Sequence, residues 1–338
     1  MTGKLEELGF ELREEAVLKI LTEDVIKSTE IEGEILNPEQ VRSSVARRLG
    51  MDISGLVRSD KHVEGVVEMM LDATQRYPKP LTKKRLFDWH AALFPTGRSG
   101  MQEIIVGKWR KDSTGPMQVV SGPMGKEKVH YEAPPSKNLE KEMKAFLEWF
   151  NAESKLDPVL KSGIAHFWFV TLHPFQDGNG RIARAIADMQ LARADGSSRR
   201  FYSMSAQIRM EREQYYRMLE KTQKGDSDIT QWLRWYLDCL HKSLNATGSI
   251  LESVLAKANF WERYRNDSFN ARQKKIINRL FDGFEGKLNT SKWAKINKCS
   301  ADTALRDIQE LLNKKILKQD KAGGRSTSYF LIPTITNS

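Results

Sequence analysis

The sequence predicts a mainly α-helical protein with one small β-hairpin and a separate small domain at its C-terminal end. Three observations predict this fold. Apolar residues recur at helical spacing through most of the chain, the interval from about 97 to 135 carries Gly, Pro and short β-prone pieces, and basic residues gather after residue 268. The 338 residues, 40% of them hydrophobic, suffice for more than one core. We expect an N-terminal helical region at 1–60, a helical core at 61–245, and a linker helix with the small domain at 246–338.

Capping residues and prolines mark the helices of the first two regions. Asn37 and Pro38 supply an N-cap and a first-turn proline for a helix that stops at Gly50. Asp157 and Pro158 repeat this signal farther along the chain. Between the helices, the stretches MQVVSG and KVHYEAPP predict the hairpin. The remaining expectations are helices over 62–77, 82–94, 136–151, 158–172 and from about 181 towards 196, with the hairpin tip at 123–127.

The C-terminal domain has the element order of a winged helix-turn-helix. In such a domain the start of the third helix, here Ser300 to Arg306, enters the DNA major groove, and the wing, here with Arg325, lies near the backbone. The same module also serves for protein docking or dimerisation, and the sequence leaves both roles open. The expected elements are helices over 270–281, 289–297 and 300–317, the last capped by Ser300, and two strands within 318–332 joined at Gly323 and Gly324.

Positive charge is concentrated in this domain. The whole chain has a formal net charge of +10 and a pI near 9.4. Residues 268–338 alone hold 14 Lys and Arg against 6 Asp and Glu. Such an excess suits contact with phosphates, which is the sequence-independent part of nucleic-acid binding. We therefore expect DNA as a partner of the C-terminal domain.

Several classes of protein and site are excluded by the pattern of residues. The N-terminus is charged and lacks the apolar core of a signal peptide, and the longest apolar run, FWFVTL, is too short to cross a bilayer. Cys239 and Cys299 lie far apart, outside disulfide-framework or zinc-ribbon spacing. The six histidines show no HExxH pattern, and GPMGKEK lacks the P-loop spacing. We expect a cytoplasmic protein that does not bind membranes.

One segment, HPFQDGNGRIAR at residues 173–184, lies between two expected helices and combines groups that suit an anion. Gly178 and Gly180 let backbone N–H groups at the start of the second helix converge on a ligand, and the helix dipole favours negative charge there. Arg181 and Arg184 lie on one side of the first helical turn, where two guanidinium groups suit a polyphosphate. The segment therefore predicts a site for a triphosphate.

The other polar residues of this segment suit phosphate chemistry. Asp177 is a hard oxygen ligand for Mg²⁺ on nucleotide phosphates, and Asn179 can hold a phosphate oxygen. His173 is the one group in the segment that accepts a proton near neutral pH. A base, a metal and an anion site without a protein nucleophile predict attack of an outside hydroxyl on a phosphate.

The segment fills every specified position of HPFxDGNGRxxR, the motif of Fic-domain proteins, which the chain resembles over roughly residues 60–240. This resemblance implies a Fic-type helical bundle that moves AMP from ATP to a Ser, Thr or Tyr hydroxyl of a protein, with Mg²⁺ or Mn²⁺. Gly180 favours AMP transfer, because relatives that act as kinases carry lysine there. The resemblance makes His173 the catalytic base and Asp177 the metal ligand, and it assigns the nucleotide phosphates to Gly178, Asn179, Gly180, Arg181 and Arg184.

The resemblance extends to the hairpin and to a later helical segment. The hairpin is similar to the flap that aligns the target chain by strand addition. The later segment is similar to the adenine-side helices, although packing in the core is an equally open interpretation of its aromatic residues. The flap residues are Val119, Val120, Ser121 and Gly122, and the expected base-pocket residues are Tyr215, Tyr216, Leu219 and Gln223, of which Gln223 stands where relatives often carry asparagine.

The stretch STEIEG resembles the (S/T)xxxE(G/N) inhibitory motif of Fic proteins that carry their own autoinhibitory helix. Here the motif consists of Ser28, Glu32 and Gly33, and the resemblance pairs Glu32 with Arg184. A carboxylate on that guanidinium takes the place of the γ-phosphate and repels the triphosphate. In some relatives the same glutamate helps to remove AMP, so we also expect a reverse activity. The resemblance further allows self-modification and a homodimer.

Two other functions remain open from the sequence. One is a DNA-binding transcriptional regulator whose Fic domain senses nucleotide or modifies the chain itself. The other is a phosphate or nucleotide hydrolase that uses the same anion site with water as the acceptor. The intact His173 favours a catalytic domain over a purely sensing one, and the flap-like hairpin favours a protein acceptor over water.

Overall fold

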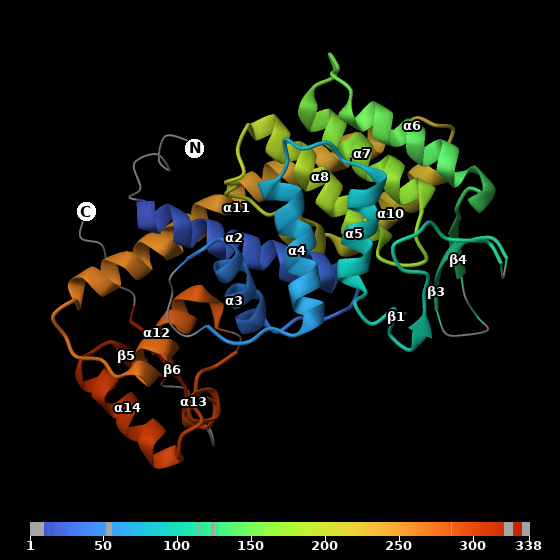
Figure 1. The fold of residues 1–338 in the computed structure, drawn as a ribbon. Helices are drawn as coiled ribbons and strands as arrows, with labels where there is room; N and C mark the ends of the chain where they lie inside the picture. Colours follow the sequence, from blue (N-terminus) through green and yellow to red (C-terminus); the bar gives the residue numbers. More distant parts are fainter. Residues whose placement is uncertain are drawn as a thin grey trace. The chain divides into compact units, whose positions relative to one another are not determined.

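The computed structural model describes residues 10–51, 56–113, 115–122, 126, 128–284, 286–320 and 327–332, and the chain is mainly helical over them (Figure 1). It divides into two compact units. The larger unit holds residues 17–247, and the smaller unit holds residues 248–338 together with the segment before residue 17. The expected mainly helical fold is confirmed. Within the described ranges, no helix combines the length and the apolar character needed to cross a bilayer.

The larger unit is a bundle of helices with two short antiparallel strand pairs, β1 with β2 and β3 with β4. Two helices are divided between the units: the first residues of α2, up to Ala16, and the last residues of α11, from Gly248, belong to the smaller unit. The elements are α2 (Phe10–Ile31), α3 (Pro38–Arg48), α4 (Lys61–Gln75), α5 (Lys83–Leu93), β1 (Arg98–Ser99), β2 (Gln102–Glu103), β3 (Gln118–Ser121), β4 (Lys128–Glu132), the 3-10 helix η1 (Ser136–Asn138), α6 (Leu139–Asn151), α7 (Pro158–Leu172), α8 (Asn179–Asp195), α9 (Met204–Met210), α10 (Arg212–Gln223) and α11 (Thr230–Arg263).

Helices α7 and α8 form the centre of this bundle (Figure 1). They pack along each other, and α4 packs against both α5 and α8. Ile182, Ile186 and Met189 of α8 are completely buried, and so are most of the polar residues of this helix, because neighbouring elements enclose it on nearly all sides. The loop between α7 and α8 is therefore anchored at both ends by the core.

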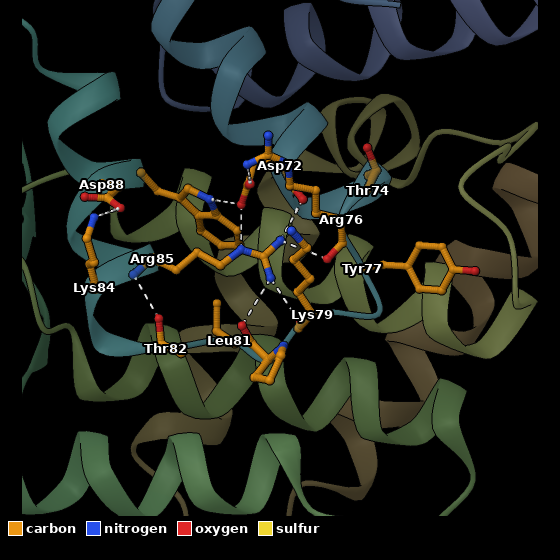
Figure 2. Close-up of polar contacts among 12 residues, drawn as sticks. Asp72, Thr74, Arg76, Tyr77, Lys79, Leu81, Thr82, Lys84, Arg85 and Asp88 are labelled. Carbon is orange, nitrogen blue, oxygen red and sulfur yellow. Dashed lines mark hydrogen bonds and ion pairs between the residues drawn. The ribbon is translucent and has the colours of Figure 1, made fainter.

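One arginine holds the connection between α4 and α5 (Figure 2). The Arg85 Nε donates to the Asp72 carboxylate at 2.6 Å, and its terminal nitrogens donate to backbone carbonyls at the end of α4 and in the turn that follows. The same Asp72 oxygen accepts from Trp89 Nε1 at 2.7 Å. Carbonyls at a helix end lack N–H donors within the helix, and the Arg85 guanidinium provides such donors. These contacts fix the orientation of α5 relative to α4.

The helix bounds differ from expectation at two places. The helix expected from about 181 begins at Asn179, because Gly178 takes a left-handed conformation (φ 79°) and serves as its N-cap. The helix expected to run to 317 ends at Asn313, because Lys315 turns the chain with a positive φ of 56°. Both corrections come from residues in the left-handed region, which end or start a helix abruptly.

The smaller unit contains α12 (Ala271–Gly283), α13 (Thr290–Asn297), α14 (Ala301–Asn313) and the antiparallel pair β5 (Leu317–Gln319) and β6 (Tyr329–Leu331). Asn270, Asn289 and Ser300 cap the three helices through their side chains. Trp293 belongs to the apolar cluster of the smaller unit, which is separate from the apolar cluster of the larger unit. The expected wing turn at Gly323 and Gly324, with Arg325, lies outside the described residues.

Candidate active site

The expected phosphate loop connects α7 to α8. Its conformation is fixed by Asn179, whose side chain accepts from the N–H of Phe175 at 2.9 Å and donates to the carbonyl of Phe175 at 2.8 Å. Phe175 is completely buried, and its ring stacks on His90 of α5 with 4.2 Å between the ring centroids. The Asn179 side chain therefore shapes the loop, and its expected contact with a phosphate stays a prediction.

A carboxylate of the chain itself lies at the start of α8. Gly180 lies in the first turn, and a Cβ built on it would lie 2.2 Å from Oε1 of Glu32. A carboxylate thus sits directly against the glycine backbone at the positive end of the helix dipole. The chain itself places an anion where the sequence predicts phosphate.

Arg181 and Arg184 of α8 point into the same region and are both almost completely buried. Arg181 Nε and Arg184 Nη1 have no hydrogen-bond partner within the described part of the chain. Buried guanidinium N–H groups are costly to leave unpaired. These two nitrogens therefore suit an additional anionic ligand such as a phosphate.

Arg184 is held by Ser28 of α2 and by Glu32, which directly follows that helix. Arg184 Nη2 donates to Glu32 Oε1 at 2.8 Å and to the Ser28 carbonyl at 2.8 Å, and Nε donates to the Ser28 hydroxyl at 3.0 Å. Burial opposes the charge of Arg184, but Glu32 together with Tyr215 and Tyr216 raises the pKa of the guanidinium above its ordinary value. The structure thus brings together the two groups that the inhibitory motif pairs by resemblance.

A glycine-dependent turn ends α2 next to this pair. The N–H of Glu34 donates to the Thr29 carbonyl at 3.3 Å, and the N–H of Gly33 donates to the Glu30 carbonyl at 3.1 Å. These two bonds define a Schellman C-cap, and Gly33 has the left-handed conformation that it needs (φ 89°). Gly33 reverses the chain so that the residues on both sides of it reach α8.

Sequence reasoning missed Glu34. Its Oε2 accepts from Arg181 Nη1 at 3.0 Å and lies 3.2 Å from Nε2 of His62, in the first turn of α4. The hydrogen bond with Glu34 raises the pKa of His62, and the same bond lowers the pKa of Glu34. The available signal was a second acidic residue just after the motif glycine, but surface glutamates are too common for that signal to decide.

His173 ends α7 in a left-handed conformation (φ 49°). Its Nδ1 lies 3.2 Å from the Val170 carbonyl, so Nδ1 is assigned the proton and Nε2 is left as the acceptor. Burial lowers the pKa of His173 to about 4, and the nearby Arg110 acts in the same direction. The imidazole is therefore neutral at pH 7, as a general base must be.

Arg110 is a second residue that the sequence did not reveal. It is buried, its Nε donates to the His173 carbonyl at 2.7 Å, and its backbone N–H donates to the Pro174 carbonyl at 2.8 Å. Its guanidinium also pairs with Asp112. Arg110 thus holds the backbone on which the imidazole is mounted.

Asp177 lies in the loop before α8, where it accepts from the Ser99 hydroxyl of β1 and from the N–H of Gly178. No cluster of three or more His, Cys, Asp or Glu that could hold a metal occurs in the residues with defined placement. One carboxylate suits a hard cation whose other ligands are phosphate oxygens and water, as for Mg²⁺ on a nucleotide. The donor chemistry at Asp177 therefore fits the expected metal.

The expected flap is the pair β3–β4. Val119 lies opposite Tyr131, Val120 lies opposite Val129, and a register shift separates these pairs. Val120 and Val129 are 47% and 43% exposed, so this part of the flap offers apolar side chains to a partner. Of the expected flap tip at 123–127, residues 123–125 and 127 lie outside the described residues.

Side-chain contacts tie the flap to the bundle. Ser121 Oγ lies 2.5 Å from Nε2 of His130, and Nδ1 of His130 lies 2.7 Å from Oε2 of Glu220 on α10. The Tyr131 hydroxyl donates to the Thr171 carbonyl at 3.0 Å, near the end of α7. The flap is therefore fixed beside the 173–184 loop, with Gly122 at its exposed end (φ 105°).

The residues expected at the base pocket all lie on α10, but in different surroundings. Tyr215 and Leu219 are buried, and the Tyr215 hydroxyl lies 2.9 Å from Nε2 of His166 within an aromatic cluster of the core. The Tyr216 hydroxyl donates to Glu32 Oε2 at 3.3 Å, and Gln223 donates to the Thr171 hydroxyl at 3.3 Å. Tyr216 and Gln223 thus lie beside the site, while Tyr215 and Leu219 pack in the core, where Tyr215 also interacts with Arg184. The nucleotide contact expected of these four residues stays a prediction.

Comparison with known proteins gives two family matches. Residues 80–191 match the model of the Fic/DOC family, and residues 1–51 match a domain of unknown function, DUF4172. Protein adenylyltransferase Fic of Drosophila willistoni is 27% identical over 227 residues, which is 65% of this chain and 40% of that protein. The protein of the same name from Drosophila melanogaster is 27% identical over 232 residues, covering 65% and 41%. The chain thus spans about 40% of the length of these curated relatives.

Two solved structures share the fold. A Fic family protein from Desulfovibrio desulfuricans G20 aligns with a TM-score of 0.52 and 20% identity, over 97% of this chain and 89% of that chain. A Fic domain containing signaling protein from Bacteroides thetaiotaomicron aligns with a TM-score of 0.54 and 21% identity, over 74% and 94%. The Fic/DOC family match at residues 80–191 includes the whole 173–184 segment, and the two solved structures show that this chain shares the fold of Fic proteins.

Proposed function

We propose that this chain is a protein adenylyltransferase whose activity is restrained by Glu32. The observation that carries the proposal is the Glu32 carboxylate, which lies against Gly180 and pairs with Arg184 at the start of α8. An internal anion there marks a site built for phosphate. The relatives named protein adenylyltransferase Fic support AMP transfer as the reaction.

The neighbouring groups suit attack by a hydroxyl. In the proposed reaction a Ser, Thr or Tyr hydroxyl of a protein attacks the α-phosphorus of ATP, and Nε2 of His173 takes the proton. The bond from the α-phosphorus to the bridging oxygen breaks, and pyrophosphate leaves. Arg181 and Arg184 hold the outer phosphates and stabilise the charge that develops on the leaving group.

Asp177 is the proposed ligand of a divalent cation. When bound, Mg²⁺ or Mn²⁺ neutralises phosphate charge and helps to orient the triphosphate. The neutral imidazole of His173 explains why the chain itself can supply the base near pH 7. The exposed Val120 and Val129 of the flap support a polypeptide as the acceptor, which includes a segment of this same protein.

Glu32 restrains the reaction in this proposal because its carboxylate and the γ-phosphate need the same guanidinium. Glu32 also remains partly exposed, at 28% of its side chain. A carboxylate in that position can orient water as well, which supports the reverse removal of AMP as a second activity of the same residue.

The experiment compares three proteins incubated with α-labelled ATP and Mg²⁺: wild type, Glu32→Gly, and Glu32→Gly with His173→Ala. We expect Glu32→Gly to label itself or a protein in a cell extract, and loss of the His173 base to lower that labelling by about 10²- to 10⁴-fold. His241→Ala in the Glu32→Gly background is the matched control, because His241 is exposed on α11. ATP binding to Glu32→Gly without label on any protein contradicts the transferase and favours a nucleotide sensor.

We propose DNA contact as a second function, assigned to the smaller unit. Lys295 of α13, Lys298 just after it and Arg306 of α14 are exposed. They lie at the two helices that a helix-turn-helix would place against a duplex, and they belong to the segment with the excess of positive charge. Binding of duplex DNA that weakens steeply with salt is the expected signature.

A further inference from the structure

Both arginines of the phosphate site are paired with carboxylates from one turn of the chain. Glu32 pairs with Arg184 at 2.8 Å, and Glu34 pairs with Arg181 at 3.0 Å. The two acids flank Gly33, whose left-handed backbone lets both side chains reach α8. The inhibitory motif accounts for the first pair alone.

We propose that Glu34 is a second inhibitory residue, which withholds Arg181 from the nucleotide as Glu32 withholds Arg184. This inference rests on the proposed function, because it assigns a further role at the same phosphate site. Arg181 is 1% exposed, so its guanidinium has little access to water and depends on Glu34 for its ion pair. A triphosphate must displace that carboxylate to reach Arg181.

His62 holds Glu34 in this position. Its Nε2 lies 3.2 Å from Glu34 Oε2, the same oxygen that Arg181 contacts. His62 belongs to α4, which packs against α8, so the third member of the cluster comes from the scaffold and not from the inhibitory turn. The Glu34 carboxylate is therefore fixed from both sides, although it is partly exposed at 39% of its side chain.

In this proposal, Glu32→Gly frees Arg184 for the nucleotide but leaves Arg181 paired with Glu34. With Glu32 gone, Arg184 is available, but Glu34 still carries a negative charge on Arg181 where phosphate must bind. Because the Schellman turn connects the two acids, a ligand that unwinds the end of α2 removes both carboxylates together. The double variant should bind ATP more tightly than either single variant.

The test measures ATP affinity without turnover. Calorimetric titration with ATP and Mg²⁺ is carried out on the full chain bearing His173→Ala, alone and combined with Glu34→Gln, Glu32→Gly or both. We expect Glu34→Gln to tighten ATP binding by about three- to tenfold, a modest gain because one partner of the pair is partly exposed. We expect the double variant to bind more tightly than Glu32→Gly alone.

A matched control and a second variant make the result specific. Glu30→Gln removes a carboxylate from the last turn of α2. Glu30 pairs with Lys27 and Arg209 and not with the arginines of the phosphate site. This variant should leave the ATP affinity unchanged. Glu34→Asp keeps the charge but withdraws the carboxylate by one methylene, and it should also tighten binding.

Three other outcomes are decisive. If Glu34→Gln behaves like Glu30→Gln while Glu32→Gly tightens binding, the second restraint is refuted and the proposed function stands. If Glu34→Gln weakens ATP binding, Glu34 orients Arg181 for the phosphates, which also overturns the inference. If no variant binds ATP, the nucleotide site itself is refuted, and the proposed function fails together with the inference.

Discussion

Gly178 and Gly180 are needed at the phosphate loop for different physical reasons. Gly178 has a φ of 79°, and a Cβ on it would lie 2.9 Å from the Phe94 ring. Gly180 is helical, and the atoms nearest to a Cβ on it would be the side-chain ends of Glu32 and Arg184. The first glycine is therefore a requirement of the fold, and the second is a requirement of the ligand.

The prediction for these residues compares Gly178→Ala with Gly180→Ala, each in the Glu32→Gly background. Gly178→Ala should lower the free energy of unfolding by about 1 to 3 kcal/mol, because a left-handed alanine is strained and the ring must move. Gly180→Ala should change stability by less than about 1 kcal/mol but abolish labelling, because its methyl group fills the anion site. Urea unfolding and transfer from α-labelled ATP measure the two effects. Undiminished labelling by Gly180→Ala would show that phosphate does not approach this glycine.

Residues close together in the sequence were predictable from their spacing, whereas long-range pairs were not, and the pair of Glu32 with Arg184 was expected through the family resemblance alone. The 173–184 segment carries its chemistry within one loop, so its spacing indicated a base and an anion site before the fold was known. The contact of Arg181 with Glu34 spans 147 positions, and it depends on how α2 docks against α8. The Asn179 side chain shows the same limit on a smaller scale, because only the folded loop reveals that it bonds to the Phe175 backbone.

At the scale of elements, a pair of buried carboxyl groups joins α2 to α8. Asp24 and Asp188 are both buried, and their side chains contact each other. Asp188 Oδ1 accepts from Arg200 at 2.6 Å, and Asp24 Oδ1 accepts from the Ser203 hydroxyl at 2.5 Å. One arginine faces two carboxyl groups, so a proton on Asp188 avoids an uncompensated buried charge.

The helix that carries the inhibitory motif should therefore bind α8 less strongly as the pH rises. Burial raises the pKa of Asp188 to about 7, and Asp24 adds to this effect, whereas an unfolded chain releases that proton near pH 4. Between about pH 4 and pH 7 the folded state holds the extra proton, so the contribution of Asp188 to stability falls as the pH rises through this window and is constant above it.

The variant Asp188→Asn tests this contribution. Its amide can donate to Asp24 and accept from Arg200 without titrating, so its stability relative to wild type should increase between pH 5 and pH 8. Urea unfolding at both values measures the change. Asp238→Asn, which removes an exposed carboxylate from α11, should show no such trend. An equal difference in stability between Asp188→Asn and wild type at the two pH values would show that Asp188 does not hold the extra proton.

At the scale of the whole molecule, the excess of positive charge and the candidate active site lie in different units. The larger unit holds the proposed phosphate site, and the smaller unit holds residues 268–338, with 14 Lys and Arg against 6 Asp and Glu. Each unit has its own apolar cluster. Surface charges of the smaller unit can therefore be removed without disturbing the site around His173.

This separation gives the last prediction, which concerns a DNA duplex. Neutralising Lys295, Lys298 and Arg306 together to alanine should weaken duplex binding and lower the slope of log affinity against log salt by about 2 to 3, because each phosphate contact contributes about 0.9. Fluorescence anisotropy over a salt series measures this slope.

The matched control neutralises three exposed lysines of the larger unit, Lys137, Lys141 and Lys144, so that the loss of net charge is the same. If both triple variants lower the slope equally, the effect is a general response to net charge and the smaller unit has no special role. If only the triple variant of Lys295, Lys298 and Arg306 lowers the slope, the smaller unit contacts nucleic acid. Combined with Glu32→Gly, this triple variant should leave the AMP labelling unchanged. If neither the parent protein nor the control binds DNA, DNA contact by the smaller unit is refuted.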